Sequence, residues 1–149
     1  MFALPRNVWI LTASLSLFMS LSVFVIFLGG IIGQTLAPSD SLSTLPVALL
    51  VVGTASGIIP INKIMSTFGR RKTFLGVCAY TLVIIALAIT SLEAQSFYLF
   101  CMATFLFGIT AATMNQFRFA AIESVEENLS ATATSAVLIG GLVSAFLGP

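Results

Sequence analysis

The sequence predicts an all-α membrane protein, a helical bundle with four full transmembrane helices and the start of a fifth. Of its 149 residues, 58% are hydrophobic and only 7% are charged, whereas a soluble domain carries about 25% charged residues. The hydrophobic residues form runs separated by short polar segments. Several runs reach the roughly 20 residues that a helix needs to cross a bilayer. A chain of this composition cannot cover itself against water, so we expect it to lie in the lipid bilayer.

The composition also excludes several classes of function. The net charge of +1 gives no electrostatic basis for binding nucleic acid. Histidine, the commonest metal ligand and the usual acid–base residue, is absent. The five acidic residues lie in loops or at the ends of the predicted helices, so they assemble neither a metal cluster nor a nucleophile–base pair. We therefore predict no enzyme, no metal site and no cofactor.

The first predicted helix covers residues 8–33. Its apolar run is too long for the core of a signal peptide, which has about 7–15 residues. It contains Ser14 and three further serines, which either bond to the backbone of their own helix or line a cavity. Gly29 and Gly33 are four residues apart, a spacing that allows another helix to approach closely.

The second predicted helix covers residues 45–68, and Thr44 suits its N-cap. Gly53 and Gly57 form a small-residue face of the kind that packs tightly against a neighbouring helix. Pro60 lies inside the same helix, where it frees a backbone carbonyl and predicts a bend. In a membrane, neighbouring helices must satisfy the freed carbonyl.

The basic turn Phe68-Gly69-Arg70-Arg71-Lys72 is the most distinctive local feature. The chain has six Lys and Arg residues, and three of them lie in this turn. Gly69 suits the position just past a helix end. The cations favour the negative end of the preceding helix dipole and the lipid headgroups. Thr73 is expected to cap a third helix over residues 74–92.

Two further runs complete the chain. A fourth helix is predicted over residues 97–121, and a polar, acidic segment follows it. The last run, residues 131–149, is shorter than a full span. Nothing about Pro149 resembles a natural terminus, so we expect the chain to be a fragment.

The charge distribution predicts an orientation. When the spans are numbered and their sides alternated, the loops around Asp40 and Glu93 contain no Lys or Arg. The basic residues all fall on or near the other side: Arg6, Lys63, Arg70, Arg71, Lys72 and Arg118. The positive-inside rule then places the N-terminus and the loop of residues 66–73 in the cytoplasm.

With this topology and basic turn, the chain resembles the amino-terminal part of a major facilitator superfamily transporter. In that family, the cytoplasmic loop between spans two and three carries the pattern Gly-x-Leu-Ala-Asp-Arg-x-Gly-Arg-Arg/Lys. The last part of this pattern is present as Phe68-Gly69-Arg70-Arg71. The rest departs from it, because Asn62, Ser66 and Thr67 stand where the family has its first Gly, its Asp and its first Arg.

Two weaker similarities lie later in the chain. Gly108 fits the glycine of an Arg-x-x-x-Gly pattern in span four, although Thr104 occupies the arginine position. The final Gly148-Pro149 resembles the Gly-Pro of the antiporter motif, with Ser135 and Ser144 where small residues are expected upstream. The topological resemblance covers nearly the whole chain, but only the Gly-Arg-Arg turn is moderately specific.

The resemblance implies that residues 1–149 form part of an N-terminal six-helix half, with a C-terminal half of the same transporter as its partner. Substrate would bind near the midplane between the halves, and access would alternate as one half rocks against the other. The implied function is transport of a small solute across the cytoplasmic membrane. The alternative is a small, non-transporting scaffold or assembly protein held by small-residue helix faces.

The candidate site residues form two groups, and each group also has an interpretation that involves no function in transport. The first group is a conformational latch and hinge. Arg70 and Arg71 either anchor a helix end or form an ionic latch with Glu123 at the same membrane face. The basic turn would act as a cytoplasmic hinge between two membrane helices, and Gly69 is part of this hinge. Gly53, Gly57 and Pro60 would let span two flex near the domain interface.

The second group is a possible substrate path along spans one and four. Arg118 either extends to the headgroups or lines the inner mouth with Asn115, which shares its helix face. Ser14 would contribute from span one. No acidic residue lies within a span core, so this part of the chain offers no carboxylate for proton coupling. The sequence predicts neither the substrate, nor the direction of transport, nor the coupling ion.

Overall fold

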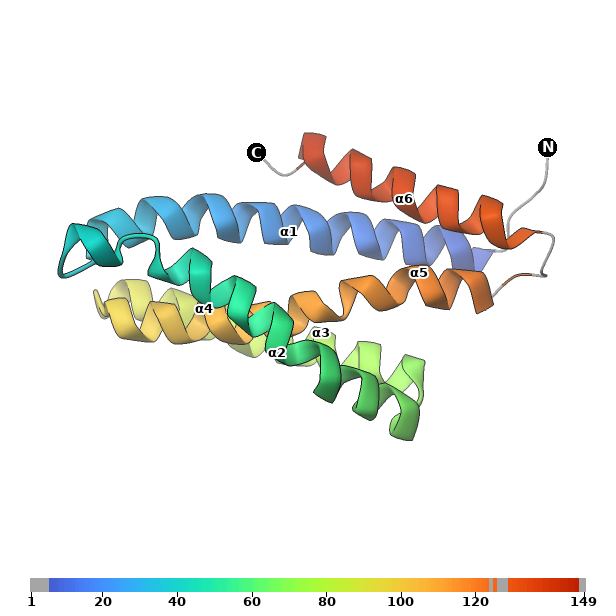
Figure 1. Cartoon of the computed structure of the whole chain (residues 1–149), viewed down its shortest axis with the longest axis horizontal. Helices are drawn as coiled ribbons and strands as arrows, with labels where there is room; N and C mark the ends of the chain where they lie inside the picture. Colours follow the sequence, from blue (N-terminus) through green and yellow to red (C-terminus); the bar gives the residue numbers. More distant parts are fainter. Residues whose placement is uncertain (1–5, 124, 126–128, 148–149) are drawn as a thin grey trace. The chain divides into compact units, whose positions relative to one another are not determined.

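The computed structural model describes residues 6–123, 125 and 129–147, and helices dominate it (Figure 1). The elements are α1 (Arg6–Leu36), the short 3-10 helix η1 (Asp40–Leu42), α2 (Leu45–Phe68), α3 (Arg70–Glu93), α4 (Phe97–Ala112), α5 (Met114–Glu123) and α6 (Ser130–Leu147). No strand occurs among the described residues. The predicted all-α fold class is therefore confirmed.

The helical segments have the lengths and compositions expected of membrane spans. Within the described part of the chain, three are long and apolar enough to cross a bilayer, namely Val8–Leu36, Asp40–Phe68 and Arg70–Glu93. Two shorter apolar segments follow, Phe97–Ala112 and Thr134–Ser144. Large hydrophobic side chains lie on the outside of the long helices, with Leu17 69%, Ile59 77% and Leu82 69% exposed. Such surfaces are stable in lipid rather than in water.

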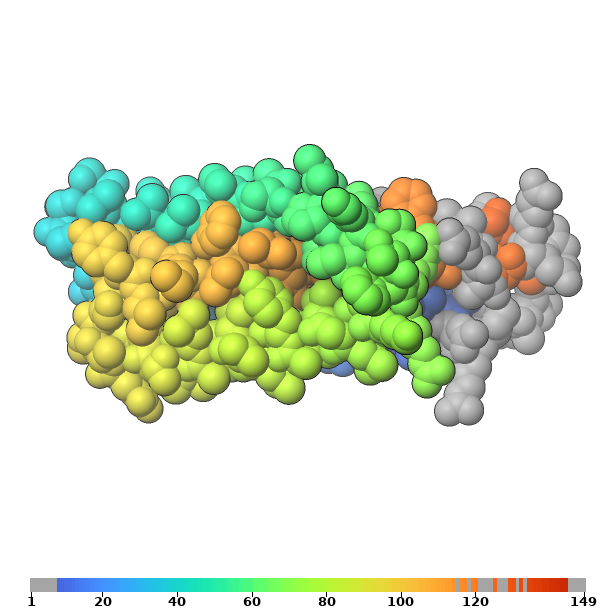
Figure 2. All heavy atoms as spheres, turned by 90° about the horizontal axis from the view of Figure 1, so that it is seen from below, coloured from blue at the N-terminus to red at the C-terminus, as the bar shows by residue number. Residues whose placement is uncertain are grey.

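The chain forms two compact units, Met1–Phe24 with Met114–Pro149, and Val25–Thr113. We call them the first unit and the second unit. In the second unit, α4 packs between α2 and α3, as Figure 2 shows from one face. Its core includes the buried Ile61, Met65 and Val77, with Phe74 and Ile109 packed against them.

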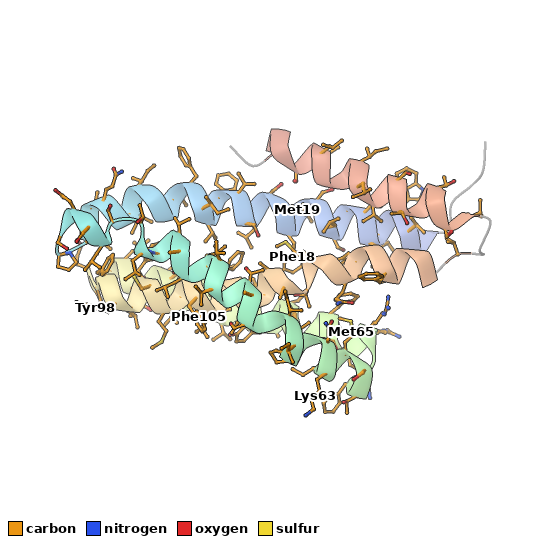
Figure 3. All side chains as sticks on the ribbon, viewed as in Figure 1. Phe18, Met19, Lys63, Met65, Tyr98 and Phe105 are labelled. Carbon is orange, nitrogen blue, oxygen red and sulfur yellow. The ribbon has the colours of Figure 1, made fainter. Side chains whose placement is uncertain are left out.

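In the first unit, the N-terminal part of α1 lies between α5 and α6 (Figure 1). Phe18, labelled in Figure 3, lies toward α5, with its ring centroid 6.0 Å from that of Phe117. Toward α6, the Ser16 hydroxyl donates a hydrogen bond of 2.6 Å to the backbone carbonyl of Gly140. Around Ser16 and Phe18, one face of α1 therefore packs against α5 and another against α6.

Helix α2 begins and ends where the sequence predicts, but its first turn is not capped as expected. Thr44 occupies the N-cap position, with φ −89° and ψ −4°, and its side chain makes no capping hydrogen bond. These are helical dihedrals, whereas a capping side chain reaches back from an extended backbone. The helix continues through the exposed Pro60 to Phe68.

The basic turn is not a loop before the third helix, and the prediction that Thr73 caps this helix is wrong. Helix α3 already begins at Arg70, so Gly69 alone connects it to α2. The Thr73 hydroxyl lies inside the first turn and donates a hydrogen bond of 2.9 Å to the Gly69 carbonyl, four residues back. The physical reason is that Arg and Lys are good helix formers, and one glycine suffices to reverse the chain.

The fourth predicted span is also not a single helix, because α4 ends at Ala112 and α5 begins at Met114. Thr113, between them, bonds with its backbone N–H to the carbonyl of Thr110 at 3.0 Å, a tighter three-residue pattern. Its hydroxyl donates to the same carbonyl. Threonine hydroxyls compete with the helix for backbone partners in this way and interrupt its regular bonding. The predicted continuous helix over 97–121 is therefore corrected to two helices.

Candidate functional site

Helices α2 and α4 meet backbone to backbone at three glycines. A Cβ atom added to Gly53 would overlap the Phe105 carbonyl oxygen and lie 3.2 Å from the Gly108 Cα atom. One added to Gly57 would lie 2.9 Å from the Ile109 Cα atom. Since these neighbours are backbone atoms, neither helix can move a side chain aside to make room. The close packing predicted for Gly53 and Gly57 is confirmed.

Gly108 is the partner in this contact that sequence reasoning missed. A Cβ atom on it would overlap the Leu50 carbonyl oxygen and lie 2.8 Å from the Thr54 nitrogen. The available signal was the four-residue spacing of Gly108 from Thr104 and Ala112, which forms a small-residue face on α4. The structure adds that α2 is the helix this face packs against.

The basic turn is built around the backbone conformation of Gly69. Its φ is +80° and its ψ is 159°, and its N–H donates a hydrogen bond of 3.0 Å to the Met65 carbonyl. This bond closes α2. The next residue, Arg70, is half-buried at the start of α3, and Arg71 and Lys72 are exposed. The three cations therefore share the first turn of one helix.

The α2–α3 groove is an open groove beside this turn, with a volume of about 480 Å³. It is lined from α2 by Ile61, Ile64 and Phe68, from α3 by Lys72, Thr73, Gly76, Val77 and Tyr80, and from α4 by Ile109. All of these residues belong to the second unit. The groove is apolar apart from Lys72 and the hydroxyl groups of Thr73 and Tyr80.

The two ends of the predicted latch belong to different units. Arg70 and Arg71 belong to the second unit, whereas Glu123 is the last residue of α5 in the first unit. The side chain of Glu123 lies outside the described part of the structure, as do those of Asn115 and Arg118 on the same helix.

Ser14 lies half-buried on α1, four residues before Phe18 and so on the same helix face as the contact to α5. Two further serines of α1, Ser16 and Ser20, bond to α6. Ser16 bonds to the Thr12 carbonyl of its own helix at 3.0 Å and also to α6. Ser20 donates to the Ser144 carbonyl of α6 at 3.4 Å. Their four-residue spacing was the available signal, because it places both on one face.

Comparison with known proteins identifies the family of the chain. The family described as Sugar (and other) transporter matches residues 10–118. The chain belongs to this family. It is part of the major facilitator superfamily, so the resemblance drawn from the basic turn and the topology is confirmed. The matched range contains the glycine contacts of α2 and α4 and the whole basic turn. Membership in a transporter family also confirms that the chain is an integral membrane protein and not an enzyme.

One relative supports the same assignment. Over 147 residues, the transporter-family chain is 37% identical to the riboflavin transporter RfnT of Brucella anthropi. The match covers 99% of this chain and 37% of the relative, so the chain spans little more than a third of that protein's length. No solved structure matches the chain.

Proposed function

We propose that the protein is a transporter that moves a small solute across the cytoplasmic membrane by alternating access. The observation that carries the proposal is the transporter-family match over residues 10–118. The three long apolar helices support it, since they supply spans for a helical bundle. In this proposal, residues 1–149 belong to an N-terminal six-helix half, and a C-terminal half completes the substrate site. If the reading frame adds no further apolar spans, the scaffold alternative replaces this proposal.

We propose the uncharged vitamin riboflavin as the first solute to test. The support is the relative named a riboflavin transporter, with 37% identity over almost the whole chain. The described parts of α1, α2 and α3 agree with a cargo of low charge. Among their residues inside the helices, away from the ends, Lys63 is the charged one, and it is exposed (labelled in Figure 3).

The test is uptake of radiolabelled riboflavin into liposomes that contain the purified protein. We expect saturable uptake that excess unlabelled riboflavin abolishes, and none in empty liposomes. Arg118→Ala should leave riboflavin uptake unchanged and reduce uptake of an anionic solute, if Arg118 lines the inner mouth with Asn115 and Ser14. Equal uptake of both solutes by this variant would reject that role. Saturable transport of other solutes, with no riboflavin uptake, would reject riboflavin and retain the transporter proposal.

We also propose that the N-terminus and the basic turn face the cytoplasm. The support is that three of the six basic residues form the first turn of α3, while the opposite loops contain none. A cysteine introduced near Asp40 should react with an impermeant thiol reagent added outside whole cells. Protection at this position, with labelling of one introduced near Lys72, would invert the orientation.

The ionic latch between Arg71 and Glu123 is tested by exchanging their charges. An exposed ion pair contributes about 0–1 kcal/mol, so each single change, Arg71→Glu or Glu123→Arg, should alter the uptake rate by up to about fivefold. The double exchange should restore the rate of the unmodified protein. Lys63→Glu is the matched control, because Lys63 is exposed on α2 and is not part of the turn. Unchanged uptake in both single variants would reject the latch.

A further inference from the structure

The α2–α3 groove contains none of the residues of the proposed substrate path. It lies between the last turns of α2 and the first turns of α3, with Ile109 of α4 contributing to its lining. Its volume of about 480 Å³ falls within the range of about 300–1,000 Å³ that small-molecule sites occupy. Gly76 keeps one side open, because a Cβ atom added there would meet nothing within 4 Å.

The lining changes in character along the groove. Lys72 lies at the end nearest the Gly69 connection, while Ile64, Phe68 and Ile109 give apolar surface. Tyr80 lies eight residues further along α3, which corresponds to about 12 Å of helix. One molecule that fits both parts has a long apolar chain and an anionic group at one end.

The electrostatics of the groove's basic end favour the same ligand. Arg70, Arg71 and Lys72 lie at the N-terminus of α3, where the helix dipole is positive and added cations are unfavourable. An anion at this point would offset both the dipole and the side-chain charges. Basic pockets between transmembrane helices are known to bind the headgroups of anionic lipids. Charge complementarity therefore selects an anionic occupant, and the apolar lining selects one with an acyl chain.

We propose that the α2–α3 groove binds an anionic phospholipid of the surrounding membrane. Its phosphate lies beside Lys72, and one acyl chain runs past Gly76 toward Tyr80. This site shares no residue with the proposed substrate path and is independent of which solute the protein carries. The conformation of the connection between α2 and α3 would then depend on the content of anionic lipid in the membrane.

The test measures lipid that stays bound to the purified protein. The protein is reconstituted in nanodiscs that contain equal amounts of phosphatidylglycerol and phosphatidylcholine, released into mild detergent and examined by native mass spectrometry. We expect bound phosphatidylglycerol in excess of phosphatidylcholine. Because each basic residue near a membrane surface contributes about 1 kcal/mol to binding anionic lipid, Lys72→Gln should lower retention about fivefold. Lys63→Gln is the matched control and should retain as much lipid as the unmodified protein.

A second pair of variants tests the apolar part of the groove. Gly76→Leu should fill it and abolish retention, and the Cβ atom of the new side chain would meet nothing within 4 Å. Gly30→Leu is the matched control, because Gly30 also lies in a helix with nothing within 4 Å of its added Cβ atom. Equal retention of both lipids, equal losses in Lys72→Gln and Lys63→Gln, or full retention in Gly76→Leu would overturn the proposal. Absence of any retained lipid would also overturn it, and would indicate that protein covers the groove.

Discussion

Replacing Gly53 with alanine is expected to destabilise the folded protein by about 1–3 kcal/mol, although the change adds only one methyl group. The methyl group would overlap the Phe105 carbonyl oxygen and crowd the Gly108 Cα atom. Backbone atoms cannot rotate away, so α2 and α4 must separate along their contact. Separation also loses the dispersion contacts on both sides of the interface, which are the main source of helix association in lipid. The measurement is the midpoint of thermal unfolding of the purified protein in detergent.

The matched control is Gly30→Ala, whose methyl group meets nothing within 4 Å. Alanine is favoured over glycine inside a helix by about 0.5–1 kcal/mol, so this variant should unfold at a slightly higher temperature. Gly108→Ala should behave like Gly53→Ala. Because both methyl groups enter the same contact, the double variant should lose less stability than the sum of the two single losses. A rise in the midpoint of Gly53→Ala would contradict backbone contact between the helices.

These glycines also show what sequence reasoning can find in a membrane protein. The four-residue spacing of Gly53 and Gly57 identifies a packing face, because the spacing alone places both on one side of a helix. The spacing carries no information about the partner. Gly108, and the carbonyl of Gly140 that accepts from Ser16, become evident only when the helices are placed in space.

The helix boundaries divide in a similar way. The limits of α2 were predictable, since an apolar run lies between a proline near its start and a glycine just after its end. The start of α3 was not, because three consecutive cations are typical of a headgroup-facing loop and also of the first turn of a helix. The break at Thr113 involves a buried hydroxyl group that bonds to the Thr110 carbonyl. Whether such a hydroxyl interrupts the helix depends on the tertiary packing around it. Local signals thus define the limits of α2, fit two conformations at the start of α3, and leave the break at Thr113 to the folded environment.

Gly69→Ala is the second change for which we expect a large effect, about 1–3 kcal/mol of lost stability. The cause differs from that at Gly53, because a Cβ atom on Gly69 would meet nothing within 4 Å. The cost arises from the backbone alone. A φ of +80° with a ψ of 159° lies in a region that is essentially restricted to glycine. An alanine would force the connection between α2 and α3 into another conformation and disturb the first turn of α3, including the basic residues.

The variant Gly69→Asn tests whether Gly69 could be replaced by a residue that tolerates an ordinary left-handed helix cap. Asparagine tolerates the left-handed helical region, in which ψ is about +30° to +60°, but the ψ of Gly69 lies far outside that range. Gly69→Asn should therefore lower the unfolding midpoint about as much as Gly69→Ala does. Gly76→Ala is the control on the adjoining helix, and it should be neutral or slightly stabilising. Rescue by asparagine would contradict this explanation, because it would show that the connection relaxes into a left-handed cap.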